Sequence, residues 1–401
     1  MPRWQDVAIL ALNMPIAKRV LLIVTQADWG GVQSFLIQFA AGLMAEGRTV
    51  LLAAGGEGEL WTRAKERGIP CHQLRHVGRE LSFQDIIAVH ELENLIKEFK
   101  PDAIHLNSSK IGVLGSLAAN QTRTGARVVY RIGGWAFLEP MAEWKRTLYR
   151  QAEKWTAGLK DTIITVNPSD EVLARQLDFK ARGDIRTVAN GLDVTTFVSR
   201  LKTRHDARLT LGLSENDFVF GTIANVYPAK ALDAYLENIK TFLDQDAGIR
   251  IVIVGGGIQF DELKTKRDQL GLQDRVLLPG QLDAPTLYSA FDVFVLPSKK
   301  EGMPWTVLEA MASGIPCLTT DVGACRWMLE EADHINGLIV PVADGPALVQ
   351  AMRNLKNDPA LRERLATAGK AAIMRRFTWE STYRGNRDAL DGAAPNTDDR
   401  R

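Results

Sequence analysis

Apolar runs of strand length alternate with amphipathic stretches along most of the chain. The first six runs are rich in β-branched residues and cover residues 20–25, 50–54, 103–106, 128–132, 162–166 and 185–188. Helical patterns occupy much of the sequence between them, as at 32–46, from 60 and through 96. Strands that alternate with helices form parallel sheets, so residues 18–195 are predicted to form one doubly wound α/β domain.

A second series of the same kind begins at residue 218. Its strand-like runs cover residues 218–223, 250–254, 276–278, 293–296, 317–319 and 338–340. Residues 190–216 between the two series are polar and rich in charge, as a connection between domains is. We therefore expect a second Rossmann-like domain over 210–376 and a helix over 377–391 that packs back on the first domain. Two such domains facing across a cleft would collect ligands there.

Composition excludes several classes of protein. The chain has 401 residues and a net charge of +1, so nothing favours nucleic acid as a partner. The three cysteines, Cys71, Cys317 and Cys325, lack disulfide or metal-ligand spacing, which is typical of a reduced, intracellular protein. Cys71 lies near His72 and His76, but no second ligand pair follows, so we expect no metal site.

The start of the chain lacks a convincing export signal. No segment reaches the ~18 uninterrupted apolar residues that a membrane-spanning helix needs. The opening 16 residues make a poor signal peptide, and either Met1 or Met14 can be the biological start.

The segment from Leu296 to Pro316 has the pattern of a buried strand, a tight loop and a helix. Glu301 lies in the predicted loop and Glu309 two turns into the helix. A helix amino terminus at the carboxyl edge of a parallel sheet can bind a phosphate, and the two carboxylates could then accept sugar hydroxyls. Carboxylates near helix starts are also common simply because they interact favourably with the helix dipole.

Glycines and a lysine follow other predicted strands. Gly30 and Gly31 stand between a strand and a helix, where they could admit a ligand or only provide the dihedral angles of a turn. The run 255–257 lacks the third glycine of a dinucleotide fingerprint, so it does not indicate NAD. Asn225 and Lys230 follow the strand at 218–223, and Lys230 is either a diphosphate ligand or a solvated lysine.

These segments together resemble one known family. The stretch from Glu301 to Pro316 resembles the signature of retaining glycosyltransferases of family 4, which have the GT-B fold: two glutamates separated by seven residues, then Ala-Met-Ala and Gly-x-Pro. Further matching segments occur in the family's order at Gly30–Gly31, 190–193 with Phe197, Lys230, 254–257, 278–280, Tyr288 with Asp292, 297–298 and 337–341. The resemblance covers about residues 20–383.

The resemblance implies a role for each matching position. Glu301 looks like the catalytic-site residue that binds donor-sugar hydroxyls, Glu309 like the ligand of the nucleotide ribose, and Lys230 like the diphosphate base. The implied donor site also includes Gly30, Gly31, Asn225, Leu282 at the nucleobase, and the backbone of Gly302, Met303, Pro304, Trp305, Thr306 and Val307. The implied acceptor side comprises Asn107, Ser108, Lys110, Arg131 and Gly133. Such enzymes need no metal and no other cofactor, because a lysine and a helix dipole offset the leaving diphosphate.

Two positions depart from the family pattern. Asn225 stands where the family usually has an arginine, so one positive charge beside the diphosphate is missing. Gly133 stands where a capsule and exopolysaccharide subgroup has a histidine before Gly-Trp-Ala-Phe. Arg131 shares a strand face with Gly133 and could supply a hydrogen-bond donor in its place.

A predicted helix carries an apolar stripe made of Trp144, Leu148, Ala152, Trp155 and Leu159. Lys145, Arg146, Arg150 and Lys154 lie on its other faces. The stripe could lie on an anionic membrane and bring the enzyme to a lipid-linked acceptor. We favour the simpler interpretation, in which the stripe faces the core of the first domain.

The sequence thus predicts a retaining glycosyltransferase of polysaccharide biosynthesis, such as that of capsule or lipopolysaccharide. It would transfer a sugar from a nucleotide-diphosphate donor, with UDP as the expected nucleotide, to a glycan or lipid-linked glycan. We expect it in the cytoplasm; peripheral contact with the inner membrane face is the alternative in which the apolar stripe faces outward. Two alternatives stay open: a nucleotide-sugar epimerase of the same fold, and a non-catalytic sugar-nucleotide-binding protein.

Overall fold

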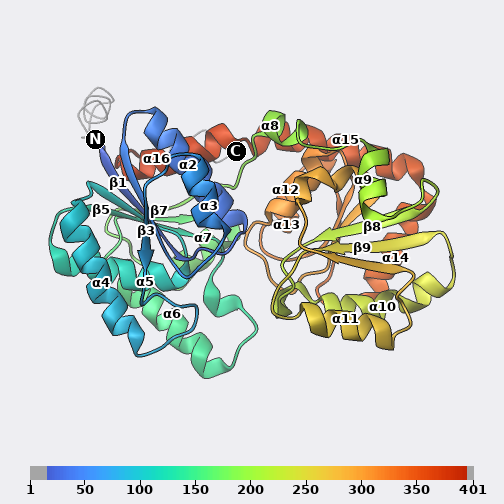
Figure 1. Ribbon diagram of the computed structural model, residues 1–401, viewed down its shortest axis with the longest axis horizontal. Helices are drawn as coiled ribbons and strands as arrows, with labels where there is room; N and C mark the ends of the chain where they lie inside the picture. Colours follow the sequence, from blue (N-terminus) through green and yellow to red (C-terminus); the bar gives the residue numbers. More distant parts are fainter. Residues whose placement is uncertain (1–15, 395–401) are drawn as a thin grey trace. The chain divides into compact units, whose positions relative to one another are not determined.

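The computed structural model describes residues 16–394, so the choice between Met1 and Met14 as the start lies outside the described residues. The chain forms two compact units (Figure 1). The first unit runs to Ala189 and resumes at Ser381, and the second unit is Asn190–Glu380. Each unit is a parallel sheet covered by helices, as the alternating sequence pattern predicted.

The first unit contains a seven-stranded parallel sheet in the order β3-β2-β1-β4-β5-β6-β7. Its strands are β1 (Arg19–Gln26), β2 (Thr49–Gly55), β3 (Cys71–Leu74), β4 (Ala103–Leu106), β5 (Arg127–Ile132), β6 (Thr162–Thr165) and β7 (Asp184–Thr187). Its helices are α2 (Gly31–Ala45), α3 (Glu59–Glu66), α4 (Gln84–Phe99), α5 (Ser109–Thr122), η1 (Ala136–Leu138), α6 (Glu143–Ala157), α7 (Pro168–Gln176) and most of α16 (Trp379–Leu390). Central strands such as β4 are buried on both faces, which explains their unbroken apolar runs.

The second unit contains a six-stranded parallel sheet in the order β10-β9-β8-β11-β12-β15. Its strands are β8 (Phe218–Ile223), β9 (Ile249–Val254), β10 (Val276–Gly280), β11 (Val293–Leu296), β12 (Cys317–Thr320) and β15 (Leu338–Val340), with a separate hairpin of β13 (Glu330–Glu331) and β14 (His334–Ile335). Its helices are α8 (Val194–Val198), α9 (Arg204–Leu211), η2 (Pro228–Lys230), α10 (Leu232–Asp244), α11 (Phe260–Gln269), η3 (Ala284–Thr286), η4 (Tyr288–Ala290), α12 (Trp305–Ala312), α13 (Cys325–Leu329), α14 (Gly345–Asn357) and α15 (Pro359–Arg376).

Strand β3 was not predicted, because its sequence Cys-His-Gln-Leu is polar and lies at the sheet edge, where only Leu74 is buried. Cys71 and His72 are therefore strand residues. Among residues 16–394, no cluster of potential ligands that could hold a metal ion is found. Nor does this part of the chain contain a helix long and apolar enough to span a bilayer.

The prediction that the stripe on α6 faces the core is wrong. Trp144 and Trp155 are 67% and 81% exposed, and Leu148 is also exposed. The buried residues of α6 are instead Glu153, Thr156 and Ala157. Glu153 can be buried because it accepts hydrogen bonds from the Tyr130 hydroxyl at 2.6 Å and from Lys160 at 3.2 Å.

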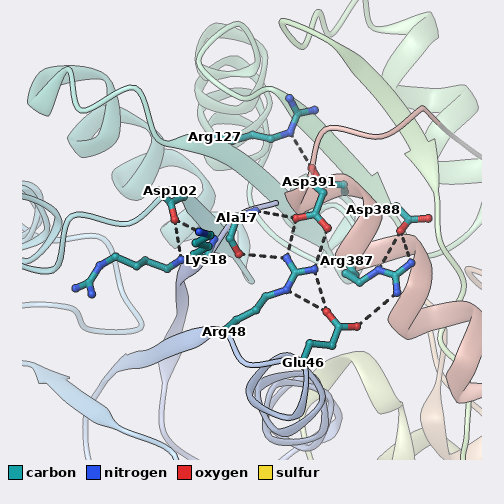
Figure 2. Close-up of polar contacts among 11 residues, drawn as sticks. Ala17, Lys18, Glu46, Arg48, Asp102, Arg127, Arg387, Asp388 and Asp391 are labelled. Carbon is teal, nitrogen blue, oxygen red and sulfur yellow. Dashed lines mark hydrogen bonds and ion pairs between the residues drawn. The ribbon is translucent and has the colours of Figure 1, made fainter. Parts of the chain in front are cut away.

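Helix α16 makes polar contacts with the carboxyl end of α2 and with the amino-terminal ends of strands of the first sheet, as Figure 2 shows. The buried Arg48 donates to both carboxylate oxygens of Asp391, at 2.7 and 2.9 Å. Arg127 donates to the carbonyl of Ala389 at 2.8 Å. On the same helix, Asn386 lies 3.1 Å from the ring nitrogen Nε2 of the buried His105. The last described helix is thus part of the first unit although it follows the second in sequence.

Candidate active site

The strand order of the second sheet reverses between β8 and β11. Strands β9 and β10 extend the sheet on the side of β8, and β12 and β15 extend it on the side of β11. The segments that follow these two neighbouring strands leave the same edge of the sheet. Ligands of doubly wound proteins bind at this kind of switch point.

Lys230 and Glu301 meet at this switch point. The lysine Nζ lies 2.6 Å from Oε1 of Glu301, and the hydroxyl of Ser298 donates to the same oxygen at 2.6 Å. The side chains of Lys230 and Glu301 keep 20% and 9% of their surface exposed. The pair is therefore formed near the surface, where a ligand can exchange with either partner.

The loop that carries Glu301 is held by backbone contacts from several segments. The amide of Lys299 donates to the carbonyl of Ala229 at 2.7 Å, which ties the loop to the segment after β8. The side-chain amide of Asn190 donates to the carbonyl of Met303 at 2.8 Å. Gly323, at φ +52°, packs so closely that a Cβ there would lie 2.3 Å from the carbonyl oxygen of Gly302. The loop is thus fixed before any ligand arrives.

Helix α12 begins at Trp305, directly after Pro304, so its amino end adjoins the loop that carries Glu301. The first turn of a helix offers backbone N–H groups without intrahelical partners and a positive dipole. Glu309 lies one turn further and is partly buried. Burial raises the pKa of Glu309 to about 7, against hydrogen bonding by Tyr288 and the charge of Arg200, which lower it. This helix end is suited to an anionic ligand.

The glycines after β9 allow close packing against the neighbouring loop and do not form a dinucleotide-binding motif. Gly255 and Gly257 adopt φ of +141° and +145°, and a Cβ on either would collide with the backbone of residues 224–226. Val226 in turn donates its amide to the carbonyl of Gly256 at 2.7 Å. The side chain of Asn225, which belongs to the supported loop, is exposed. Leu282, after β10, is 38% exposed.

The first sheet has its own switch point between β1 and β4. The hydroxyls of Thr25 and Ser108 lie 2.5 Å apart and join the ends of these strands. Gly30 precedes α2 with extended backbone at φ −171°, and Gly31 opens the helix. Neither glycine has a positive φ, so a requirement for unusual dihedral angles does not explain the pair.

Polar residues at the switch point of the first sheet are largely buried. Asn107 is 2% exposed, and its amide donates to the carbonyls of His105 at 3.0 Å and Ile23 at 3.3 Å. Burial, followed by the charge of Arg131, lowers the pKa of His105 to about 3, so this histidine is neutral. The side chains of Asn107 and His105 therefore contact other residues of the first unit.

The three other residues predicted on the acceptor side lie in different environments. The Lys110 ammonium pairs with Asp85 at 2.6 Å and also donates to the carbonyl of Glu80, with 8% of the side chain exposed. Arg131 is buried, with its guanidinium 4.1 Å from the ring centre of Phe35, and burial lowers its pKa to about 9. Gly133 is exposed, and a Cβ there would meet no atom within 4 Å.

Two family models match the chain, one on each unit. The model described as "Glycosyl transferase 4-like domain" matches residues 30–191, and "Glycosyl transferases group 1" matches residues 204–372. Together they cover the switch point of the second sheet and the segment with the two glutamates. The chain is a glycosyltransferase of family 4.

Named relatives and solved structures agree with this family and with its GT-B fold. The chain is 28% identical over 282 residues to the UDP-Gal:alpha-D-GlcNAc-diphosphoundecaprenol alpha-1,3-galactosyltransferase of Escherichia coli, covering 69% of this chain and 72% of that protein. It is 24% identical to the lipopolysaccharide core biosynthesis glycosyltransferase LpsD of Rhizobium meliloti, over 90% and 95% of the two chains. The structure of Anabaena HepE in complex with UDP and glucose superposes with a TM-score of 0.77 at 19% identity, over 94% and 100% of the two chains.

Within this glycosyltransferase, the second unit brings together most of the predicted donor residues. Lys230, Glu301 and the backbone of residues 302–307 lie around one loop and one helix end. The sequence alone did not assign roles to the residues that hold them, namely Ser298, Asn190, Gly323 and Tyr288. Three of these four, Ser298, Asn190 and Tyr288, lie in segments that carry the family resemblance, which is the signal that could have identified them.

Proposed function

We propose that this glycosyltransferase moves a sugar from a nucleotide-diphosphate donor, a UDP-sugar, to a hydroxyl of a glycan or lipid-linked glycan with retention of configuration. The observation that carries the proposal is the contact between Lys230 and Glu301 beside the amino end of α12. The complex of HepE with UDP and glucose supports a UDP-sugar as the donor. The name of the E. coli relative, which specifies UDP-Gal and a diphosphoundecaprenol-linked sugar, supports both substrates in glycan biosynthesis.

The free site exchanges partners when such a donor binds. Lys230 leaves the carboxylate of Glu301 for the diphosphate, and Glu301 becomes free to accept hydrogen bonds from sugar hydroxyls. The N–H groups of the first turn of α12 add to the positive potential at the phosphates. Glu309 accepts the ribose hydroxyls. Lys230 and the helix end then oppose the charge that develops on the leaving diphosphate.

The reaction itself requires no dedicated base from the protein. The bond between the anomeric carbon and the diphosphate oxygen breaks, the acceptor oxygen bonds to the same face of that carbon, and a donor phosphate oxygen takes the acceptor proton. Because Lys230 and α12 provide positive charge, we propose that transfer proceeds without a metal. Undiminished transfer in a chelator is the expected result.

The donor assignment is tested by incubating the protein with UDP-, GDP- and dTDP-sugars and measuring nucleotide release. We expect release from a UDP-sugar, and Glu301→Ala should reduce it by about a hundredfold or more with the protein still folded. Glu331→Ala is the matched control, since Glu331 is a partly buried carboxylate of the same unit that pairs with Arg375. Equal activity of Glu301→Ala and the control would refute the site.

The two other classes of protein give different outcomes in the same assay. An epimerase would interconvert donor sugars without an acceptor, and a binding protein would retain the nucleotide without release or transfer. The anomeric configuration of a transferred sugar, read by NMR, tests retention. A product of inverted configuration would contradict the front-face reaction.

An exposed apolar surface on the first unit supports a lipid-linked acceptor. It consists of Trp144 and Trp155 of α6 together with Phe83 and Ile86 at the start of α4, and Phe83 is 94% exposed. Lys110 of α5 donates to the carbonyl of Glu80 and pairs with Asp85, so the segment before α4 lies beside α5. Helices α4, α5 and α6 are neighbours on one side of the sheet (Figure 1).

Basic residues accompany this surface on α6. Lys145 and Lys154 are exposed, and Arg146 and Arg150 are partly exposed. Apolar side chains flanked by lysine and arginine bind anionic bilayers by burying area and by charge attraction. We therefore propose that the enzyme works in the cytoplasm and makes peripheral contact with the inner face of the membrane.

Co-sedimentation with lipid vesicles tests this contact. The protein should bind phosphatidylglycerol vesicles, and Trp144→Ser with Trp155→Ser should weaken binding about tenfold or more. Leu209→Ser, at an apolar residue of α9 that is 70% exposed, is the control and should bind as the wild type does. Vesicle binding that is unaffected by the two tryptophan substitutions would refute the proposed membrane contact.

A further inference from the structure

The carboxylate of Glu309 is hydrogen-bonded to one side chain from another element. The hydroxyl of Tyr288, on η4, lies 2.5 Å from Oε2 of Glu309. The same hydroxyl lies 3.3 Å from the backbone carbonyl of Thr306, one turn earlier on α12. The Oε1 oxygen of Glu309 has no hydrogen-bond partner within residues 16–394. One oxygen of the carboxylate is thus held and the other is left for a ligand.

The hydroxyl of Tyr288 has a fixed position because its ring is enclosed. Tyr288 is fully buried, and the rings of Phe197, Phe291 and Phe294 surround it with centroids 5.8, 6.2 and 5.9 Å away. A ring packed on three others cannot change rotamer without opening the core. The bond to Glu309 therefore sets the orientation of a flexible side chain that would otherwise sample several rotamers.

We propose that Tyr288 is a positioning residue that orients the Glu309 carboxylate toward the vicinal ribose hydroxyls of the nucleotide. The inference rests on the proposed function, in which Glu309 binds the ribose. Each carboxylate oxygen has two acceptor sites, so Oε2 can accept from Tyr288 and from the ligand together. The arrangement favours a ribonucleotide over a 2′-deoxyribonucleotide, because the deoxy analogue leaves a desolvated carboxylate oxygen without its donor.

The groups around Glu309 also affect its pKa. Burial raises the pKa of Glu309, while the Tyr288 hydroxyl bond and then the Arg200 charge lower it. Arg200 follows α8 and pairs with Asp283 at 2.7 Å. From α15, Lys370 lies beside Gly314, beyond the carboxyl end of α12. Loss of the Tyr288 hydroxyl should therefore raise the pKa of Glu309 further and leave more of it protonated near neutral pH.

The test is calorimetric binding of UDP and 2′-deoxy-UDP to the full chain from about pH 6.5 to 9. Tyr288→Phe should weaken UDP binding about tenfold near pH 7 and by less near pH 9, where Glu309 is ionised in both proteins. It should also reduce the preference for UDP over 2′-deoxy-UDP. Glu309→Gln should cost at least as much affinity as Tyr288→Phe, and adding Tyr288→Phe to Glu309→Gln should cost little more, because the tyrosine acts through the carboxylate.

Tyr235→Phe is the matched control. Tyr235 is buried in the same unit, on α10, and its hydroxyl has no partner among residues 16–394. It should bind both nucleotides as the wild type does at every pH. Equal behaviour of the two Tyr→Phe variants, with UDP bound by the wild type, would overturn the role of Tyr288 alone. Failure of the wild type to bind UDP would overturn the UDP-specific donor and this inference together.

Discussion

The two switch points of this enzyme use polar residues in opposite ways. In the second unit, Lys230 and Glu301 form an ion pair near the surface, the contact that we propose is exchanged for the donor. In the first unit, Asn107 is buried and bonded to backbone, and Lys110 is committed to Asp85. The difference lies in the partners: Asn107 and Lys110 also donate to backbone carbonyls, whereas Lys230 and Glu301 contact each other through side chains alone.

The largest expected effect comes from a matched pair of lysine substitutions. Lys230→Met should lower the rate of transfer by about a hundred- to a thousandfold, because the leaving diphosphate loses its fixed positive charge. Lys110→Met should change the rate by less than about threefold but lower the melting temperature by several degrees, because Asp85 loses its partner. Steady-state kinetics and thermal unfolding of both variants measure this. A loss of transfer in Lys110→Met without a change in stability would place Lys110 in the acceptor site after all.

A second prediction concerns the rigidity of the loop that carries Glu301. In Gly323→Ala the new Cβ would collide with the carbonyls of Glu301 and Gly302, so we expect about a tenfold or greater loss of transfer and a stability loss of about 1–3 kcal/mol. Gly256→Ala is the control, since a Cβ there meets only the Gln281 side chain, at 3.8 Å or more. Kinetics and denaturant titrations compare the two. Full activity in Gly323→Ala would show that the loop need not be fixed in advance.

The third prediction follows from the pKa of Glu309, which is raised to about 7 from 4.5. The folded protein holds this proton more tightly than the unfolded chain, so the stabilising contribution of the protonated form is full below about pH 4.5 and is lost as the pH rises through about 7. Glu309→Gln should therefore gain about 2–3 kcal/mol over the wild type at pH 8 relative to pH 5. Denaturant unfolding at both pH values measures the difference. An equal difference at both would mean that Glu309 is ionised throughout.

The smallest expected effect is at Gly133, where the first unit has open space. Gly133→His restores the residue of the related subgroup, and its Cβ would meet no atom within 4 Å. We expect transfer to rise by no more than about tenfold, with unchanged stability. Gly125→His is not a suitable control, because Gly125 has φ +76°. The matched control is Gly78→His, since no atom lies within 4 Å of a Cβ there either. A fall in transfer would show that the site is adapted to glycine at this position.

The sequence predicted the central strands of both sheets and the segment with the two glutamates. Strands buried on both faces have continuous apolar runs, which is why they can be predicted from the sequence alone. Edge strand β3 has no such run, and the pattern of α6 was misleading because the buried Glu153 packs inward while Trp144 and Trp155 face outward. The bond between Tyr288 and Glu309 links two elements through rotamers, which no linear pattern encodes.

The return of α16 to the first unit has a consequence for synthesis on the ribosome. His105 and Arg48 lie in the first third of the chain, yet their partners Asn386 and Asp391 are translated after the whole of Asn190–Glu380. At 5–20 residues per second the first unit therefore waits about 10–40 s for its final helix. During that interval the surface of α2 at Gly42, which Tyr383 later covers, is open to chaperones. A nascent chain stalled before Ser381 should bind them more than the released protein does.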